Sequence, residues 1–315
     1  MPRLPLLAAL LLSVSLTLGA GGPDAAIAEG DRAREDGRPA EAVEAYSRAL
    51  EEDPCAVPAL HGRALARRRL GEFRAALADL AAAVELEPRN AALHHDLGLT
   101  RLDAGNLKGA VEAYDEAIRL DPGVSRTWNN RGFARRLLGD ADGALRDITM
   151  AIQIDPGSAR AYRHRALCLY NLGDWEDALG DFETAVRLEP AGQDHAHLRL
   201  WILRARLGRR AKADGELEAW LDAGNPADAF PQTAGRFLLG KATRQELLDA
   251  AGSGGGRDER VRRSEAHFLA ASRALADGDP DAARADLEAA LRQGVEETEV
   301  IRSAAAELER LGRKD

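Results

Sequence analysis

Residues 125–158 read SRTWNNRGFARRLLGDADGALRDITMAIQIDPGS, and their pattern of glycine, alanine and proline recurs along the chain every 34 residues. The most regular marker is a proline near the end of each unit, found at Pro54, Pro88, Pro122, Pro156 and Pro190. This period is that of a two-helix repeat in which each unit stacks only on its neighbours. The sequence therefore predicts an all-α solenoid of helix-turn-helix hairpins.

Aligning these prolines defines five units, which span residues 23–56, 57–90, 91–124, 125–158 and 159–192. Position 15 of every unit is glycine, the residue that most readily adopts the left-handed conformation ending a first helix. Positions 20 and 27 are always alanine, as in Ala144 and Ala151, which lets two helices approach closely. Position 24 carries a larger side chain, such as Tyr46 or Phe182, which we expect to fill the gap between hairpins.

Composition supports this fold and limits the class of function. Hydrophobic residues make up 45 % of the chain but aromatic residues only 4 %, as expected of an alanine-rich helical core. The formal net charge of −9 argues against a general nucleic-acid-binding protein.

The unit at 125–158 resembles the tetratricopeptide repeat (TPR) in its Trp128, Gly132 and Gly139, and also in Ala144, Ala151 and Pro156. Residues 23–192 are similar to that family throughout. The resemblance implies a right-handed superhelix whose first helices line a concave groove that accepts extended peptides or a partner's helix. The expected function is therefore protein–protein interaction.

The repeat pattern decays after Pro190 but continues in part. Residues 193–251 are expected to form a degenerate TPR-like hairpin and short helices, and residues 252–257 a glycine-rich linker. Residues 258–315 predict a further TPR-like hairpin and a terminal capping helix. The capping helix carries an apolar stripe at Val300, Ile301, Ala304, Leu308 and Leu311.

Three short C-terminal stretches extend the resemblance to the NlpI-like periplasmic lipoproteins: Ala219-Trp220-Leu221, residues 236–240 and residues 265–268. Members of that family are homodimeric adaptors that bring cell-wall hydrolases and a periplasmic protease together. The resemblance thus implies a homodimer with such partners. The first cysteine here is Cys55, so the lipid-attachment cysteine is missing and outer-membrane tethering is in doubt.

Residues 1–20 have the parts of a secretory signal: Arg3, an apolar run from Leu6 to Leu18, and the small residues Gly19-Ala20. Thirteen residues are too few to span a membrane comfortably, since about 20 are needed. We expect cleavage near Ala20 and export to the periplasm or cell envelope. An uncleaved membrane anchor and an N-terminal core helix are the alternatives.

Charge is distributed unevenly between the two helices of the units that begin at 57, 125 and 159. Their positions 1–15 contain eleven arginines and no acidic residue, whereas positions 16–34 contain fourteen Asp or Glu. Wherever position 7 of a unit is arginine, position 23 is aspartate. This covariation predicts three structural ion pairs, Arg63 with Asp79, Arg131 with Asp147, and Arg165 with Asp181.

The remaining polar and cationic residues predict a peptide-binding groove. Its expected residues are Arg126, Asn130, Arg160, Arg163 and His164, with Arg68, Arg69 and Arg136 further along. Asn130, Arg160 and His164 occupy positions resembling the carboxylate clamp of some TPR proteins, but His95 and Leu99 stand where that clamp uses Lys and Asn. The alternatives are a less specific groove for acidic peptides and a solvated basic face.

No motif for catalysis, cofactor binding or metal binding stands out, so we expect a non-enzymatic protein without cofactors. His195 and His197 would point to different sides of a helix, and Cys55 and Cys168 lie too far apart along the solenoid for a disulfide. The first functional hypothesis is an exported adaptor. The second is a cytoplasmic or membrane-anchored co-chaperone or signalling adaptor that grips acidic C-terminal peptides.

Overall fold

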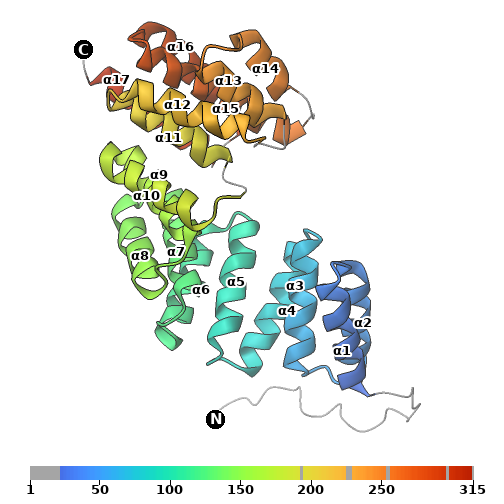
Figure 1. Cartoon of the computed structure of the whole chain (residues 1–315). Coiled ribbons are helices and arrows are strands. Elements are labelled where there is room, and N and C mark those ends of the chain that lie inside the picture. The colour runs from blue at the N-terminus through green and yellow to red at the C-terminus, as the bar shows by residue number, and fades with distance from the viewer. Residues whose placement is uncertain (1–21, 192–193, 225–228, 253–255, 296–297, 314–315) are drawn as a thin grey trace. The chain divides into compact units, whose positions relative to one another are not determined.

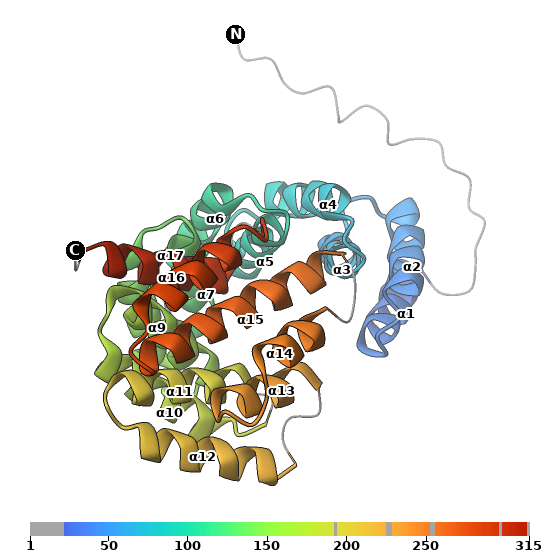
Figure 2. The same cartoon turned by 90° about the horizontal axis from the view of Figure 1, so that it is seen from above.

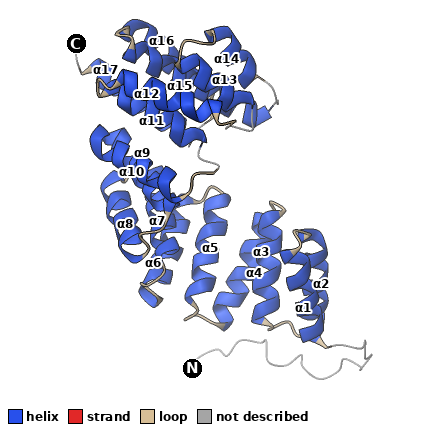
Figure 3. Ribbon diagram, in the orientation of Figure 1, coloured by secondary structure: helices blue, strands red, loops and turns tan. Residues whose placement is uncertain are grey.

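The computed structural model describes residues 22–191, 194–224, 229–252, 256–295 and 298–313. Within these ranges the chain forms 17 helices and no strand, which confirms the predicted all-α fold (Figure 3). The expected signal at residues 1–20 lies outside the described residues. The chain divides into two compact units, residues 1–120 and 121–315, near the end of the third expected repeat.

Unit 1 is a stack of helical hairpins in the order of the sequence (Figure 1). The hairpins pair α1 (Pro23–Glu35) with α2 (Pro39–Glu52), α3 (Val57–Arg69) with α4 (Phe73–Leu86), and α5 (Ala91–Asp103) with α6 (Leu107–Leu120).

Unit 2 begins with two hairpins of the same kind, α7 (Ser125–Leu137) with α8 (Ala141–Ile154), and α9 (Ala159–Leu172) with α10 (Trp175–Leu188). A third pair, α11 (Asp194–Arg206) and α12 (Arg210–Asp222), follows in the degenerate region. The short helices α13 (Ala229–Leu238) and α14 (Arg244–Ala251) come next.

The C-terminal part of unit 2 consists of α15 (Gly256–Ala276), α16 (Pro280–Leu291) and α17 (Glu299–Gly312). Helix α15 starts inside the segment 252–257 that was expected to be a linker, so the end of that segment is helical. In the described ranges, every helix is too short or too polar to span a membrane.

Turn geometry repeats along both units because glycine ends the first helix of each hairpin. Gly139 has φ 86° and Gly278, in the C-terminal hairpin, has φ 82°. Residues with a Cβ rarely adopt this left-handed backbone, so glycine at position 15 fixes where the chain reverses.

Hairpins close on small residues at the helix contact. Ala144 and Ala151 are fully buried in α8, and Ile148 fills the space between them and the neighbouring helices. An added Cβ at Gly132 of α7 would lie 2.7 Å from Ile148 Cγ1 and 3.1 Å from the Ala144 carbonyl oxygen. The backbones of α7 and α8 are therefore as close as glycine permits.

Larger side chains take over the core towards the C-terminus of unit 2. Trp201, Phe182, Tyr170 and Phe268 are almost wholly buried in one cluster that joins α9, α10, α11 and α15. Helix α17 packs against α16 and α15 and also against α9, so the C-terminal helix returns to the first helix of the fifth repeat (Figure 2).

We predict opposite effects for two glycine-to-alanine substitutions in unit 2. Gly132→Ala should lower the free energy of unfolding by about 1–3 kcal/mol, because the new methyl group overlaps Ile148 and the α8 backbone. Gly180→Ala in α10 should raise it by about 0.5–1 kcal/mol, since nothing lies within 4 Å of the added Cβ. Urea denaturation followed by circular dichroism measures both. Equal effects would contradict the close approach of α7 and α8.

Candidate binding site

Each of the three Arg–Asp pairs expected from the sequence is present as a two-pronged hydrogen bond between the helices of one hairpin. Arg131 Nε and Nη2 lie 2.8 and 2.7 Å from the two carboxylate oxygens of Asp147. The same two atoms of Arg63 lie 2.9 and 2.7 Å from Asp79, and those of Arg165 both lie 2.7 Å from Asp181. These arginines are therefore committed to the hairpin.

A second arginine joins two of these pairs, which sequence reasoning missed. Arg67 Nη1 is 2.7 Å from Asp79, and Arg135 Nη1 is 3.0 Å from Asp147. Both stand four residues after the first arginine and so lie on the same helix face. That spacing was the available signal. In the fifth repeat Leu169 occupies this position, and among the described residues Asp181 pairs with Arg165 alone.

Neighbouring first helices are also linked, by residues 35 positions apart. In unit 1, His61 Nε2 lies 2.6 Å from Asp96 Oδ2, and Arg68 Nε lies 3.4 Å from Asp103 Oδ2. Arg69 extends to the carbonyl oxygen of Arg34. Arg68 and Arg69, expected in the groove, thus help to join consecutive repeats of unit 1.

The equivalent link in unit 2 recruits the C-terminal helix. Arg136 stands at the repeat position of Arg68, but Asn171 stands where Asp103 would supply a carboxylate. Glu299 of α17 supplies it instead, with its Oε1 3.0 Å from Arg136 Nη2. The Asn171 side chain hydrogen-bonds Ser303, also on α17, at 3.1 Å. Arg136 is therefore buried beneath α17.

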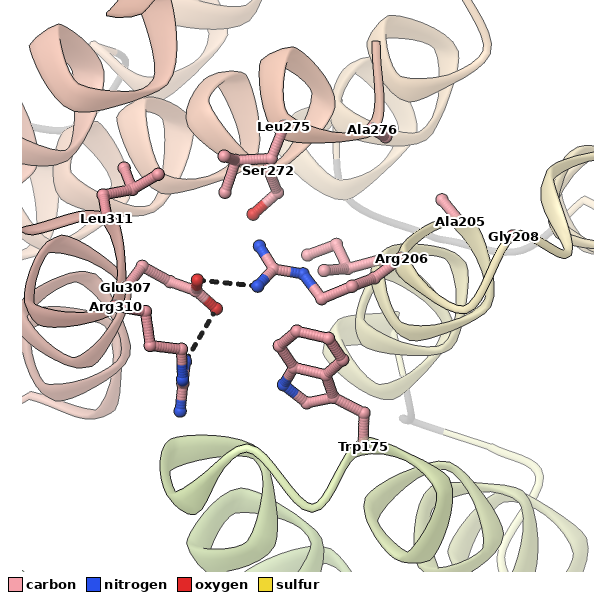
Figure 4. Close-up of a pocket in the computed structure, with 11 residues that line it drawn as sticks. Trp175, Ala205, Arg206, Gly208, Ser272, Leu275, Ala276, Glu307, Arg310 and Leu311 are labelled. Carbon is pink, nitrogen blue, oxygen red and sulfur yellow. Dashed lines mark hydrogen bonds and ion pairs between the residues drawn. The ribbon is translucent and has the colours of Figure 1, made fainter. Parts of the chain in front are cut away.

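Further along α17, the buried carboxylate of Glu307 is a second anchor. It accepts hydrogen bonds from the Tyr170 hydroxyl and from Arg206 Nη1, each at 2.8 Å, and lies 3.1 Å from Arg310 Nη1. Glu307, Arg206 and Arg310 line a cavity of about 380 Å³. Figure 4 shows Glu307 joined to both arginines, with the Arg206 guanidinium over the Trp175 ring.

The backbone ends of α7 and α9 complete the attachment of α17. Arg302 donates to the Arg136 and Leu137 carbonyl oxygens, and Arg310 donates to those of Tyr170 and Asn171. Terminal carbonyl groups of a helix lack partners within the helix and carry partial negative charge. Two arginines of one helix thus satisfy the ends of two others.

Next to α17 lies a larger cavity of about 710 Å³. Its lining includes three of the expected groove residues, Arg160, Arg163 and His164 of α9. The C-terminal region also lines the cavity, with Arg199 of α11, Glu265 of α15 and Glu299 of α17. The site is thus built by the repeats together with the C-terminal helices, which the sequence pattern did not indicate.

His164 is the buried titratable group of this cavity. Its Nδ1 is 3.0 Å from Asn129 Oδ1, and its ring stacks on Phe133 with centroids 5.0 Å apart. Burial lowers the pKa of His164 well below its usual value, and the charges of Arg160, Arg136 and Arg163 lower it further. The imidazole is therefore neutral near pH 7.

The expected groove residues divide into several groups. Arg126 and Arg160 are exposed, at equivalent positions of α7 and α9, and neither makes a hydrogen bond or ion pair within the described ranges. Arg163 is half-buried at the cavity. The expectation that Asn130 and Arg136 face an open groove is wrong, because Asn130 is buried in α7 and Arg136 is covered by α17.

Several other sequence expectations concern reactive groups. His195 pairs with Glu265 at 2.6 Å, whereas the His197 ring stacks on Trp220, so the two histidines do turn to different partners. Neither cysteine forms a disulfide, and burial raises the pKa of the Cys168 thiol to about 11. Over the described part of the chain, no group of three or more His, Cys, Asp or Glu is placed to hold a metal ion.

Comparison with known families shows tetratricopeptide repeats at residues 61–125 and 140–201. A comparison with curated proteins gave no match.

Solved structures of similar fold agree with this assignment. A tetratricopeptide-repeat protein from Parabacteroides merdae is 15 % identical over 91 % of this chain and 98 % of its own, with a TM-score of 0.56. PilF of Pseudomonas aeruginosa is 18 % identical over 67 % of this chain and 94 % of its own, with a TM-score of 0.58. A MamA fragment from Desulfovibrio magneticus RS-1 is 17 % identical over 54 % of this chain and 96 % of its own, with a TM-score of 0.50. At these identities the likeness concerns the fold.

We predict that Asp147 is critical for the stability of unit 2. Asp147→Ala leaves Arg131 and Arg135 without their shared carboxylate and should lower the free energy of unfolding by about 3–5 kcal/mol. Adding Arg131→Leu should recover part of this loss, because one unpaired charge is removed. Urea denaturation of the two single variants and the double variant gives the coupling. Strictly additive effects would show that the residues do not interact.

We predict opposite pH dependence for two histidines of unit 2. Because His164 has a lowered pKa in the folded state, the unfolded chain binds its proton first as the pH falls below about 6.5. Its contribution to stability is therefore lost on acidification, by up to about 2 kcal/mol between pH 7 and pH 5. His164→Gln should remove this loss in urea denaturation measured across that range.

His195→Gln is the matched control. The charge of Glu265 and its hydrogen bond raise the pKa of His195, so this pair contributes stability at low pH that disappears as the pH rises through the folded-state pKa. Its removal should make the protein relatively less stable at pH 5 than at pH 7. Identical pH profiles for the two variants would contradict the assignment.

Proposed function

We propose that this tetratricopeptide-repeat protein is a non-enzymatic adaptor of the bacterial cell envelope that binds acidic segments of partner proteins through unit 2. Stacked two-helix repeats present extended surfaces suited to binding other proteins. The finer proposal concerns which surface is used and where the protein works.

The observation that carries the proposal is the pair of exposed, unpartnered arginines Arg126 and Arg160 within the described part of unit 2. They occupy the same position of consecutive repeats, on helices that pack together. Most other arginines of these first helices are committed to Asp147, Asp181 or Glu299. In a chain with net charge −9, an uncommitted cationic surface favours an acidic partner.

The burial of Asn130 and His164 does not favour a carboxylate clamp built on them. A clamp needs exposed donors that reach the terminal carboxylate of a peptide. Arg126, Arg160 and Arg163 can instead contact acidic side chains along an extended segment, which is a less specific mode of recognition.

The cellular setting rests on residues 1–20, whose charged, apolar and small-residue parts suit an export signal. By resemblance to the NlpI-like adaptors, the proposed partners are cell-wall hydrolases or an envelope protease, bound by a homodimer. A membrane-anchored form would use the same N-terminal segment uncleaved.

We predict that a variant with Arg126, Arg160 and Arg163 changed to alanine loses most of its partner binding. Affinity capture from envelope extract, followed by mass spectrometry, should recover acidic partner proteins with the unaltered chain and markedly less of them with this variant. Higher ionic strength should weaken the same captures, because the attraction is between exposed charges.

The matched control changes Arg146, Arg187 and Lys212 to alanine. These residues are exposed on the second helices α8, α10 and α12, so the control loses the same charge from other elements. The control should retain its partners. Equal capture by the triple-arginine variant and the unaltered chain would exclude this surface as the binding site.

N-terminal sequencing of the mature protein tests the export part of the proposal separately. A start near Gly21 supports cleavage and export. An intact N-terminus with the protein in the membrane fraction supports the anchored form, and an intact N-terminus in the cytoplasmic fraction would exclude the envelope role.

A further inference from the structure

We propose that the 710 Å³ cavity of unit 2 binds a carboxylate carried at the end of an apolar chain. This goes beyond the proposed adaptor function, because it concerns a small ligand bound by the buried Arg199, although Arg160 and Arg163 of the proposed adaptor surface also line the cavity. It is a site for a compact amphiphilic ligand.

The walls of the cavity determine the shape of ligand that fits. They come from α7, α9, α10, α11, α15 and α17, so a ligand would contact helices of the repeats and of the C-terminal region. The volume lies within the range of about 300–1,000 Å³ that is usual for small-molecule sites. The apolar lining residues include Phe133, Leu167, Phe182, Val261 and Val300.

Arg199 is the cationic group that would pair with an anionic ligand. The residue is only 8 % exposed, and it makes no hydrogen bond or ion pair with any residue in the described ranges. Its Nη1 is among the buried polar atoms without a partner. A buried charge without a partner is costly, and a carboxylate in the adjoining cavity would supply one.

Two aromatic rings hold the Arg199 guanidinium in place. Its Cζ lies 5.0 Å from the centre of the Tyr170 ring and 4.3 Å from that of Phe268. Cation–π contacts of this kind stabilise the charge and fix the orientation of the guanidinium, but they do not provide its N–H groups with a hydrogen-bond acceptor. The guanidinium is thus held in a fixed position before a ligand binds, and its Nη1 has no hydrogen-bond partner.

The acids that line the cavity do not supply the missing partner. Glu265 pairs with His195 at 2.6 Å, and Glu299 pairs with Arg136 at 3.0 Å. Arg160 adds a further cation at the same cavity. The lowered pKa of His164, partly caused by nearby arginines, is consistent with this positive environment. The local charge therefore favours an anionic ligand.

The chemistry of the lining points to a carboxylate on an apolar chain. A planar carboxylate matches the fork of a single guanidinium, and its single negative charge would be balanced by the one buried arginine, Arg199. The aliphatic and aromatic walls would cover the rest of the molecule. A free fatty acid and the C-terminal residue of a peptide with a large apolar side chain both have this chemistry.

Isothermal titration calorimetry on the full mature chain tests the proposal. Decanoate represents the free acid, and decanol is its uncharged control. A pentapeptide ending in leucine, as the free acid and as the amide, represents the peptide source. We expect saturable binding of decanoate or of the peptide acid, and at least about tenfold weaker binding of the matching decanol or peptide amide. Whichever of the two acids binds shows whether the ligand is a free fatty acid or a peptide C-terminus.

Two variants locate the binding in this cavity. Arg199→Met removes the buried charge while keeping an unbranched apolar side chain, and should weaken binding at least about tenfold. Val261→Trp keeps Arg199 and fills part of the cavity, so it tests the site even if Arg199→Met does not fold. Arg146→Met, on exposed α8 surface, is the charge-loss control and should bind normally.

Several results would overturn the proposal. These are no binding of either acid, equal binding of decanoate and decanol together with equal binding of the peptide acid and its amide, or unchanged binding by a folded Arg199→Met or Val261→Trp variant. Arg126 does not line the cavity, and Arg199→Met leaves Arg126, Arg160 and Arg163 in place, so failure here is distinguishable from failure of the adaptor function.

Discussion

The close approach of the two helices in each hairpin is the constraint on which the rest of the structure depends. At Gly132 the backbone of α7 nearly touches α8, and Ala144 and Ala151 leave no space beside it. With so little room for water, a carboxylate such as Asp147 must find its donors within the protein. Arginines of the first helix therefore pair with carboxylates of their own hairpin and are not available to a ligand. The tight packing thus limits which positive charges remain free at the surface.

The features that could be predicted from the sequence are those that recur within one repeat. These features are the proline period, the left-handed glycine at Gly139 and the pairing of position 7 with position 23. Each involves residues at a fixed and short spacing, so it can be compared between the five units. The arrangement around α17 occurs once. Arg136 and Glu299 are 163 residues apart, and no periodicity relates them. The apolar stripe of α17 predicted a helix but not the polar side chains that attach it to α7 and α9.

The same distinction explains the candidate site. Counting charges in the first helices correctly located a concentration of arginine, but a count does not separate a cation bound to its own hairpin from one that faces solvent. Arg131 and Arg126 lie on one helix and differ completely in this respect. The sequence did not predict a role for Arg199, because this residue lies outside the regular repeats. Its significance depends on burial between Tyr170 and Phe268, which only the three-dimensional structure reveals.

Asn171 has a consequence for how the C-terminal helix is attached. A repeat array has no intrinsic end, because every unit offers its successor the same interface. At Arg136 the amide of Asn171 replaces the carboxylate that joins consecutive repeats at Arg68 and Asp103 in unit 1, and α17 takes the vacated role. At this junction α17 supplies the carboxylate that Arg136 pairs with. The C-terminal helix is thus attached by the same kind of side-chain pair that joins two repeats of unit 1.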